Sequence, residues 1–405
     1  MPRPLPAHLA SAMSLWLSSR AALTSLPSGW PPSKTPDDAV GRRLSELAAE
    51  IARRGPEGVG AALDRLLRRR AEAFLTGIEA YRGHPFRRPP PHVAVSWQAG
   101  AARLLDYGIA GNGPAVAPTA LIVPSLINRY YILDLLRERS FARDLATAGL
   151  RPLVLDWGEP GEAEGDFTLD DYISGPLAAA LSAAVEIAGG PVALCGYCMG
   201  GLLAVALALR QPADVAALAL LATPWDFHAE RQAQARLLGD LVELLPVLIG
   251  DSRTAPVSLV QSLFVALDPF LAERKFIRFS GLDPAGEAAR GFVALEDWIN
   301  DGVPLARRVA TECARSWYRD NEPALGRWRV AGEPVLPEKI AAPTLLVLPS
   351  RDRIVPPRSA AALAAAIPGA AVMRPPFGHI GMMASTEAPK AVWRPIGQWL
   401  RAQFD

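Results

Sequence analysis

Residues 191–210 read PVALCGYCMGGLLAVALALR, and this stretch decides the fold. PVALCG has the length of a buried strand, and MGGLLAVALALR has the length and composition of a buried helix. Between them stands Gly196-Tyr197-Cys198-Met199-Gly200, a G-x-C-x-G in which cysteine has the place of serine in a nucleophile elbow. Such a tight turn needs small residues two positions before and after the nucleophile, and Gly196 and Gly200 meet that need. The stretch predicts a strand–nucleophile–helix unit with Cys198 at the turn.

The same letters contain a second pattern, because Cys195 and Cys198 form a C-x-x-C pair. Such a pair is typical of redox dithiols in small domains, or of half a zinc site. Zinc needs further ligands, and Cys313 is the only other cysteine, with no histidine at ligand spacing around it. We therefore favour the elbow, predict no metal, and interpret Cys195 as a core residue at the end of the strand.

Composition limits the classes of protein that the chain can be. The 405 residues carry a net charge of +1, which gives no general attraction to nucleic acid or to anionic membranes. Three cysteines in so long a chain exclude a disulfide framework and predict a reducing, cytoplasmic location. The apolar positions of the N-terminus are interrupted by Ser, Pro and Arg, which argues against a signal peptide, and no transmembrane segment is predicted.

The pattern of the chain changes near residue 95. Residues 1–94 are predicted to form a helical N-terminal extension that ends in the proline-rich stretch HPFRRPPPH. Apolar strands are then predicted at the four ranges 119–127, 151–158, 191–196 and 215–223. Helices are expected between them, one over residues 132–149 and one opened by a capping box at Thr168–Asp171. This alternation predicts a parallel sheet that is covered by helices on both faces.

The alternation stops at Pro224 and returns with a strand at residues 343–350. The mixed, mostly helical residues between them are predicted to form a cap. We therefore predict an α/β-hydrolase fold, with a core of residues 95–223 and 336–405 and a cap or lid insertion of residues 224–335. A cap in this place covers the carboxyl ends of the strands, where parallel sheets bind their ligands.

An acid and a histidine follow the late strands. Asp352 stands directly after the strand 343–350, and His379 lies in the glycine-flanked loop PPFGHIG. Cys198, Asp352 and His379 therefore have the nucleophile–acid–histidine order of hydrolase folds. We predict a catalytic triad of these residues, with the backbone N–H of Met199 as an oxyanion donor.

Longer segments of the sequence resemble one particular family. The G-x-C-x-G-G box at residues 196–201, PSLINRYYILDL at 124–135 and DWGEPGEAEGDFTLDDYISG at 156–175 resemble polyhydroxyalkanoate synthases. LEDWINDGVPLARRVATECARSWYRDN at 295–321, IVPP and GHIG extend this resemblance, which covers roughly residues 95–400. The chain is most similar to the short class III synthases that work with a second subunit. It departs from them at Arg353, where the family usually has histidine.

The resemblance implies a reaction and its participants. The Cys198 thiolate would attack the thioester of a 3-hydroxyacyl-CoA and release CoA, and Asp352 with His379 would activate the hydroxyl of the next unit. A second oxyanion donor would come from the loop at Ile127. The implied partners are the acyl-CoA, the growing polyester chain, and either a second copy or a synthase subunit. No cofactor is implied, and the location would be the cytoplasm or the surface of polymer granules.

Two alternatives stay open on the sequence alone. A cysteine-dependent hydrolase of the same fold would cleave a thioester or a polyester. A non-catalytic, granule-associated relative would keep the fold and lose the triad, whereas this chain has all three residues.

Overall fold

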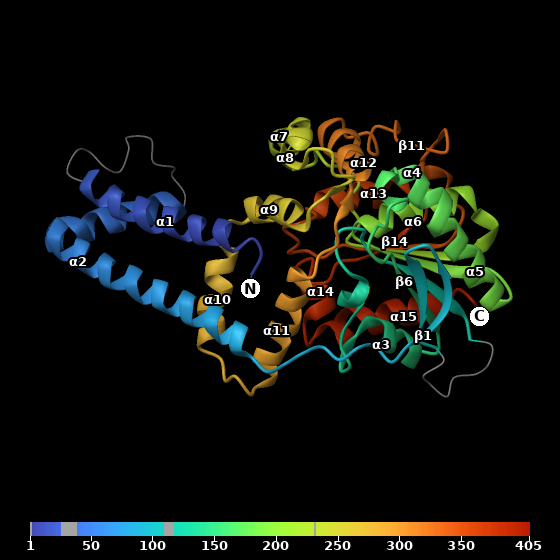
Figure 1. Ribbon diagram of the computed structural model, residues 1–405, viewed down its shortest axis with the longest axis horizontal. Coiled ribbons are helices and arrows are strands. Elements are labelled where there is room, and N and C mark those ends of the chain that lie inside the picture. Colours follow the sequence, from blue (N-terminus) through green and yellow to red (C-terminus); the bar gives the residue numbers. More distant parts are fainter. Residues whose placement is uncertain (1, 26–38, 109–116, 231) are drawn as a thin grey trace. The chain divides into compact units, whose positions relative to one another are not determined.

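The computed structural model describes residues 2–25, 39–108, 117–230 and 232–405. The chain forms two compact units (Figure 1). Unit 1 contains residues 1–86 and 261–293, and unit 2 contains residues 87–260 and 294–405. Residues 26–38, which belong to the predicted N-terminal extension, lie outside the described residues. The domain limits expected at residues 94, 223 and 335 stay a prediction.

Unit 2 is built on an eight-stranded sheet with the order β1-β2-β6-β3-β7-β8-β13-β14. β1 and β2 form an antiparallel hairpin, β2 runs antiparallel to β6, and every later pair is parallel. Its strands are β1 (Ala94–Ala99), β2 (Ala102–Asp106), β3 (Thr119–Val123), β6 (Arg151–Asp156), β7 (Val192–Tyr197), β8 (Val215–Leu221), β13 (Thr344–Val347) and β14 (Ala371–Met373). β3 and β7 are buried along their whole length, because the chain covers both faces of a parallel sheet.

Two groups of helices pack against this sheet (Figure 1). α5 (Ala178–Ala188) and α6 (Met199–Arg210) contact β3 and β7. α3 (Phe141–Thr147) contacts β6, α15 (Arg394–Arg401) contacts β8, and the two helices contact each other. α13 (Pro357–Ala366) follows β13. Apolar residues of α5, α6 and α13 are buried with strand residues in one continuous core, which holds the sheet rigid beneath the site.

Short elements complete unit 2. They are β4 (Asp134–Leu136), β5 (Arg139–Ser140), α4 (Leu169–Tyr172), α7 (Gln232–Asp240), α8 (Leu245–Ile249), β9 (Thr254–Ala255), β10 (Leu305–Ala306), α12 (Arg307–Glu312), β11 (Arg329–Val330), β12 (Glu333–Pro334) and α14 (Gly381–Ala384). A π-helical segment, η7 (Cys313–Arg319), follows α12 directly. Most of the elements between β8 and β13 are helical.

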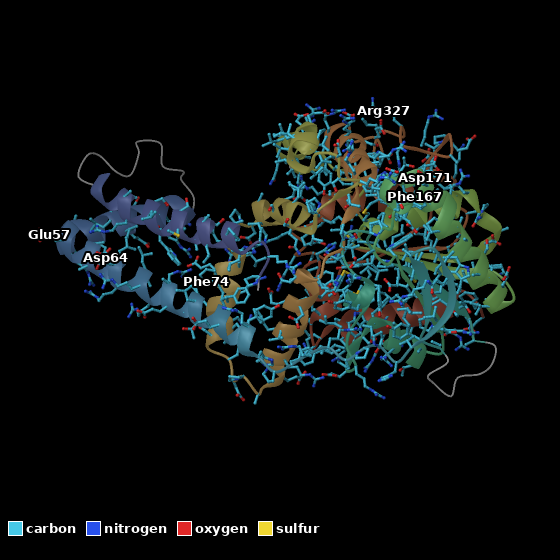
Figure 2. The ribbon with its side chains drawn as sticks, in the orientation of Figure 1. Glu57, Asp64, Phe74, Phe167, Asp171 and Arg327 are labelled. Atoms are coloured by element: carbon cyan, nitrogen blue, oxygen red, sulfur yellow. The ribbon has the colours of Figure 1, made fainter. Side chains whose placement is uncertain are left out.

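Unit 1 is helical and has its own core. It contains α1 (Leu5–Ser25), α2 (Ala39–Gly83), which kinks at Gly55, and α10 (Leu271–Ser280). Helices α9 (Val257–Leu267) and α11 (Glu287–Asn300) each have one end in this unit. Phe74 of α2, labelled in Figure 2, is fully buried and packs edge-on against Phe276 of α10, with 6.3 Å between ring centroids. These aromatic contacts join the N-terminal helices to residues 261–293.

The predicted fold class is confirmed, and one predicted element is wrong. The capping box at Thr168 is present: its hydroxyl accepts from the N–H of Asp171, and the Asp171 carboxylate accepts from the N–H of Thr168. The helix predicted over residues 132–149 begins only at Phe141, because Asp134–Leu136 and Arg139–Ser140 form a hairpin. Asp134 is buried between the hydroxyl of Tyr107 and the guanidinium of Arg143, and these long-range contacts outweigh the helical pattern.

Candidate active site

Cys198 lies at the turn between β7 and α6. Its backbone has φ 56° and ψ −125°, a strained conformation for a residue with a side chain, and α6 begins at the next residue, Met199. Its N–H donates to the carbonyl of Leu221 at the end of β8, which ties the turn to the neighbouring strand. This geometry lifts the thiol above the carboxyl edge of the sheet, as in a nucleophile elbow.

The glycines around Cys198 allow the turn to close. A Cβ at Gly196 would collide with the backbone of Gly201, and a Cβ at Gly200 would collide with the carbonyl oxygen of Val123 in β3. Gly201 faces the side chain of Thr223 at a similarly short distance. The backbones of α6, β7 and β3 therefore approach so closely that each position requires glycine.

Replacing Gly200 by alanine is expected to destabilise the fold. The added methyl group meets backbone atoms, which cannot rotate away, so we expect a loss of about 1–3 kcal/mol in the free energy of unfolding. Denaturant titration measures this loss. Gly175→Ala is the matched control, because its Cβ would point into open space and alanine favours a helix. Equal stability of the two variants would contradict the close approach.

Asp352 and His379 come together in unit 2. His379 Nδ1 lies 2.7 Å from Asp352 Oδ2, and both side chains are buried. The other oxygen, Asp352 Oδ1, accepts from the N–H groups of Ile354 and Val355 at 2.9 and 2.8 Å. These two bonds hold the carboxylate in one orientation, so it presents a fixed acceptor to the imidazole.

The protonation of His379 reflects both of its neighbours. Burial alone lowers the pKa of His379, but the negative charge of Cys198, the hydrogen bond that Asp352 accepts from the ring and a side-chain interaction with Cys198 outweigh burial and raise the pKa to about 10. Asp352 occupies Nδ1, so Nε2 is the ring nitrogen left to interact with Cys198. The structure thus pairs His379 with Asp352 and brings Cys198 within electrostatic reach of the ring.

The stability of the protein should fall at alkaline pH because of His379. Its pKa in the folded state, about 10, lies above the ordinary value of 6.5, so the proton stabilises the fold fully below pH 6.5 and progressively less up to pH 10. Denaturant titrations across this range measure the effect. His379→Asn should remove this part of the dependence, whereas parallel curves for wild type and variant would contradict the raised pKa.

The two predicted oxyanion donors differ in their present partners. Met199 is the first residue of α6, and the first N–H groups of a helix have no acceptor within the helix. The N–H of Ile127 donates to Ser125 Oγ at 3.2 Å. It therefore becomes available to a substrate oxygen only if the Ser125 hydroxyl rotates or is displaced.

The other cysteines have different surroundings. Cys195 is fully buried in β7, and burial raises the pKa of its thiol to about 12. Burial also raises the pKa of Cys313. Both thiols are free. Among the described residues, no group of three or more His, Cys, Asp or Glu side chains could hold a metal ion. Within this part of the chain, no helix is both long and apolar enough to span a membrane.

Two tyrosines at this site are absent from the sequence-based candidates. The Tyr197 ring lies against His379, with centroids 5.2 Å apart, and its hydroxyl donates to the His379 carbonyl at 3.2 Å. Loss of solvent around the phenol raises the pKa of Tyr318, and the charge of Cys198 raises it further, so this residue is within electrostatic reach of the thiol. Only the position of Tyr197 beside Cys198 in the motif could have indicated one of them.

The fold and this site define a class of protein. The alpha/beta hydrolase fold family matches residues 121–385, and the chain belongs to this family. The solved structure of the BpoC protein from Mycobacterium tuberculosis H37Rv shares the fold, with a TM-score of 0.51 and 18% identity; the match covers 78% of this chain and 99% of that one.

Within this class the chain is similar to poly(3-hydroxyalkanoate) polymerase subunits PhaC. It is 29% identical to PhaC of Allochromatium vinosum over 303 residues, which cover 73% of this chain and 84% of that protein. It is 27% identical to PhaC of Synechocystis sp. over 346 residues, or 81% of this chain and 90% of that protein. The predicted resemblance to polyhydroxyalkanoate synthases is confirmed.

Proposed function

We propose that this chain is an acyltransferase that polymerises (R)-3-hydroxyacyl-CoA into a polyester through a covalent thioester on Cys198. One observation carries the proposal: the buried Asp352–His379 pair, which interacts electrostatically with Cys198 at the turn after β7. The similarity to PhaC over most of the chain supplies the substrate class. The cycle needs no cofactor, because the CoA thioester is itself the activated substrate.

The first half of the cycle transfers the acyl group to the enzyme. The Cys198 thiolate attacks the thioester carbonyl, and the negative charge that develops on oxygen is stabilised by the N–H of Met199, with Ile127 as second donor. The bond from the carbonyl carbon to the CoA sulfur breaks, and His379 gives its proton to the departing CoA thiolate. The product is an acyl-Cys198 thioester of nearly the same energy as the substrate.

The second half forms the ester bond. His379, held by Asp352, takes the proton from the hydroxyl of another hydroxyacyl unit. The alkoxide attacks the acyl-Cys198 carbonyl, an ester forms, and the thiolate is released for the next cycle. Burial of Asp352 and His379 limits the access of water to this step, because water in place of the hydroxyl would release a free acid.

Incubation with 3-hydroxybutyryl-CoA tests the proposal. We expect release of CoA together with insoluble polymer. Release of CoA with only free 3-hydroxybutyrate would identify a cysteine hydrolase instead. No release of CoA, with the purified chain alone or after addition of a PHA synthase partner subunit, would favour a non-catalytic relative. Size-exclusion chromatography during turnover tests whether a second copy of the chain assembles, and sedimentation with polymer tests association with granules.

A further inference from the structure

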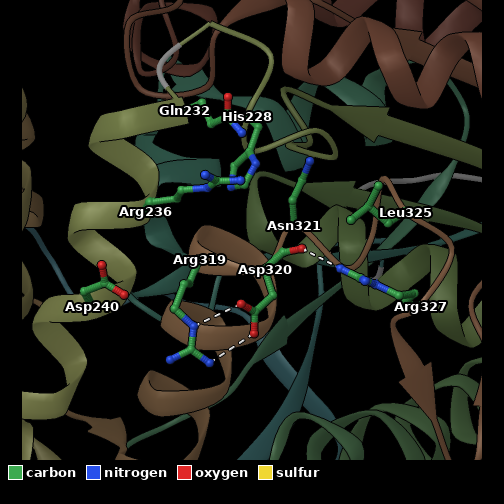
Figure 3. Close-up of a pocket in the computed structure, with 9 residues that line it drawn as sticks. All are labelled: His228, Gln232, Arg236, Asp240, Arg319, Asp320, Asn321, Leu325 and Arg327. Atoms are coloured by element: carbon green, nitrogen blue, oxygen red, sulfur yellow. Dashed lines mark hydrogen bonds and ion pairs between the residues drawn. The ribbon is translucent and has the colours of Figure 1, made fainter.

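A polar pocket lies in unit 2, and its lining does not include Cys198, His379 or Asp352 (Figure 3). Its volume is about 480 Å³, within the range of small-molecule sites. One wall is α7 with Arg236 and Asp240, and another is the segment after η7 with Asp320 and Arg327. Nothing in the proposed triad chemistry uses these residues.

The pocket concentrates guanidinium groups. Three arginines and two aspartates line it, which leaves one net positive charge while His228 is neutral. Arg319 is occupied, because its Nε and Nη2 donate to the two Asp320 oxygens at 3.0 and 3.1 Å. Among the described residues, neither Arg236 nor Arg327 forms an ion pair with a carboxylate, although the charge of Arg327 acts on the nearby Asp320 carboxylate. Two guanidinium groups therefore remain available to an anion.

The backbone and side-chain contacts hold the two walls in place. Arg327 donates to the carbonyl oxygen of Asp320 at 3.1 Å (Figure 3). Asn321 accepts from the N–H of Phe227 and donates to Asp226, which joins the segment after η7 to the loop that follows β8. The Arg236 side chain extends from α7 toward His228. The cationic groups thus face a cavity with fixed walls.

Tyr318 connects this pocket to the nucleophile. Its carbonyl accepts a hydrogen bond from Nε2 of His228, a pocket residue, at 2.9 Å. Burial raises the pKa of its phenol, and the charge of Cys198 raises it further. The Tyr318 ring packs against that of Phe227, with 4.9 Å between ring centroids. Tyr318 therefore interacts both with His228 of the pocket and with Cys198.

We propose that this pocket, through Arg236 and Arg327, binds the phosphate groups of the CoA half of the substrate. The inference rests on the proposed transfer of an acyl group from CoA. In CoA, the pantetheine arm separates the thioester from a diphosphate and a ribose phosphate. An anion site that does not include Cys198, His379 or Asp352 fits this separation. Guanidinium groups bind phosphate oxygens in pairs, and the remaining carboxylate of Asp240 can accept from an adenine amine.

Kinetics with two thioesters test the assignment. The double variant Arg236→Gln/Arg327→Gln should raise the KM for 3-hydroxybutyryl-CoA on the order of tenfold, because two charge-assisted bonds are lost. The KM for 3-hydroxybutyryl-pantetheine, which lacks the phosphates, should not change. Arg137→Gln, an exposed arginine outside the pocket, is the matched control. The Lys/Lys double variant should recover part of the affinity, since charge is kept.

Three results would overturn the proposal. The first is an equal rise in KM for both thioesters in the double variant, which would mean a structural effect. The second is an unchanged KM for the CoA thioester. The third is binding of ATP, measured by calorimetry, that CoA does not displace, which would assign the pocket to a separate nucleotide.

The test remains decisive if the proposed acyl transfer itself fails. Should wild type release no thiol from either thioester, calorimetry with free CoA replaces kinetics. Weaker CoA binding in the double variant, with unchanged thermal unfolding, would support the pocket. Equal CoA binding in wild type and double variant would overturn it.

Discussion

Cys198→Ala is expected to lower the release of CoA from 3-hydroxybutyryl-CoA by roughly 10⁴–10⁶-fold, as loss of a nucleophile does in comparable triads. Without the sulfur no acyl-enzyme can form, and water must attack the thioester directly. A thiol-reactive dye measures the released CoA. The loss of the neighbouring negative charge should also lower the pKa of His379, which NMR titration of the imidazole can follow.

Cys195→Ala separates this result from a general effect of losing a thiol. The side chain is fully buried and its pKa is raised, so it contributes packing and little thiolate. We expect some loss of stability and nearly unchanged turnover in the folded fraction. Full activity of Cys198→Ala, or inactivity of a folded Cys195→Ala, would reverse the assignment of the two cysteines.

Asp352→Asn should have the second-largest effect, with kcat lowered by up to about 10⁴-fold. The amide oxygen can still accept from Ile354 and Val355, so the loop should keep its shape. The amide nitrogen then faces His379 Nδ1 and donates to it. This forces the proton onto Nε2, where the ring can no longer accept one from Cys198 or from the substrate hydroxyl.

Two measurements distinguish this tautomer effect from misfolding. The pKa of His379 should fall, because a charge and its hydrogen bond are lost, and the free energy of unfolding of Asp352→Asn near neutral pH should fall only by the amount that this lower pKa accounts for. Asp352→Glu keeps the charge and should recover part of the rate. A kcat for Asp352→Asn within tenfold of wild type would exclude the proposed role.

Local sequence patterns were enough to predict the elbow and most of the sheet. Residues 191–210 contain their own strand, turn and helix, and the collisions at Gly196 and Gly200 arise within or next to that unit. The β3, β6 and β8 strands are continuous apolar runs, which predict buried parallel strands directly. Cys198, Asp352 and His379 could be named because each directly follows, or lies soon after, a predicted strand.

Helical periodicity failed where long-range contacts were stronger. Residues 134–140 form a hairpin because Asp134 is bonded to Tyr107, 27 positions away, and to Arg143. The association of residues 261–293 with the N-terminal helices depends on aromatic packing such as Phe74 against Phe276. No local sequence pattern predicts such contacts, because the stabilising free energy comes from burying surfaces that meet only when the chain folds.

The sequence by itself determined which residues carry the chemistry and the order in which they follow the strands. The tertiary structure alone decided their distances: the 2.7 Å contact of His379 with Asp352, the Tyr197 ring against the imidazole, and the Ser125 hydroxyl at the Ile127 N–H. It alone also assembled the arginine pocket, whose walls come from α7 and from the segment after η7. Side chains far apart in sequence meet only when the packed core fixes the loops that carry them.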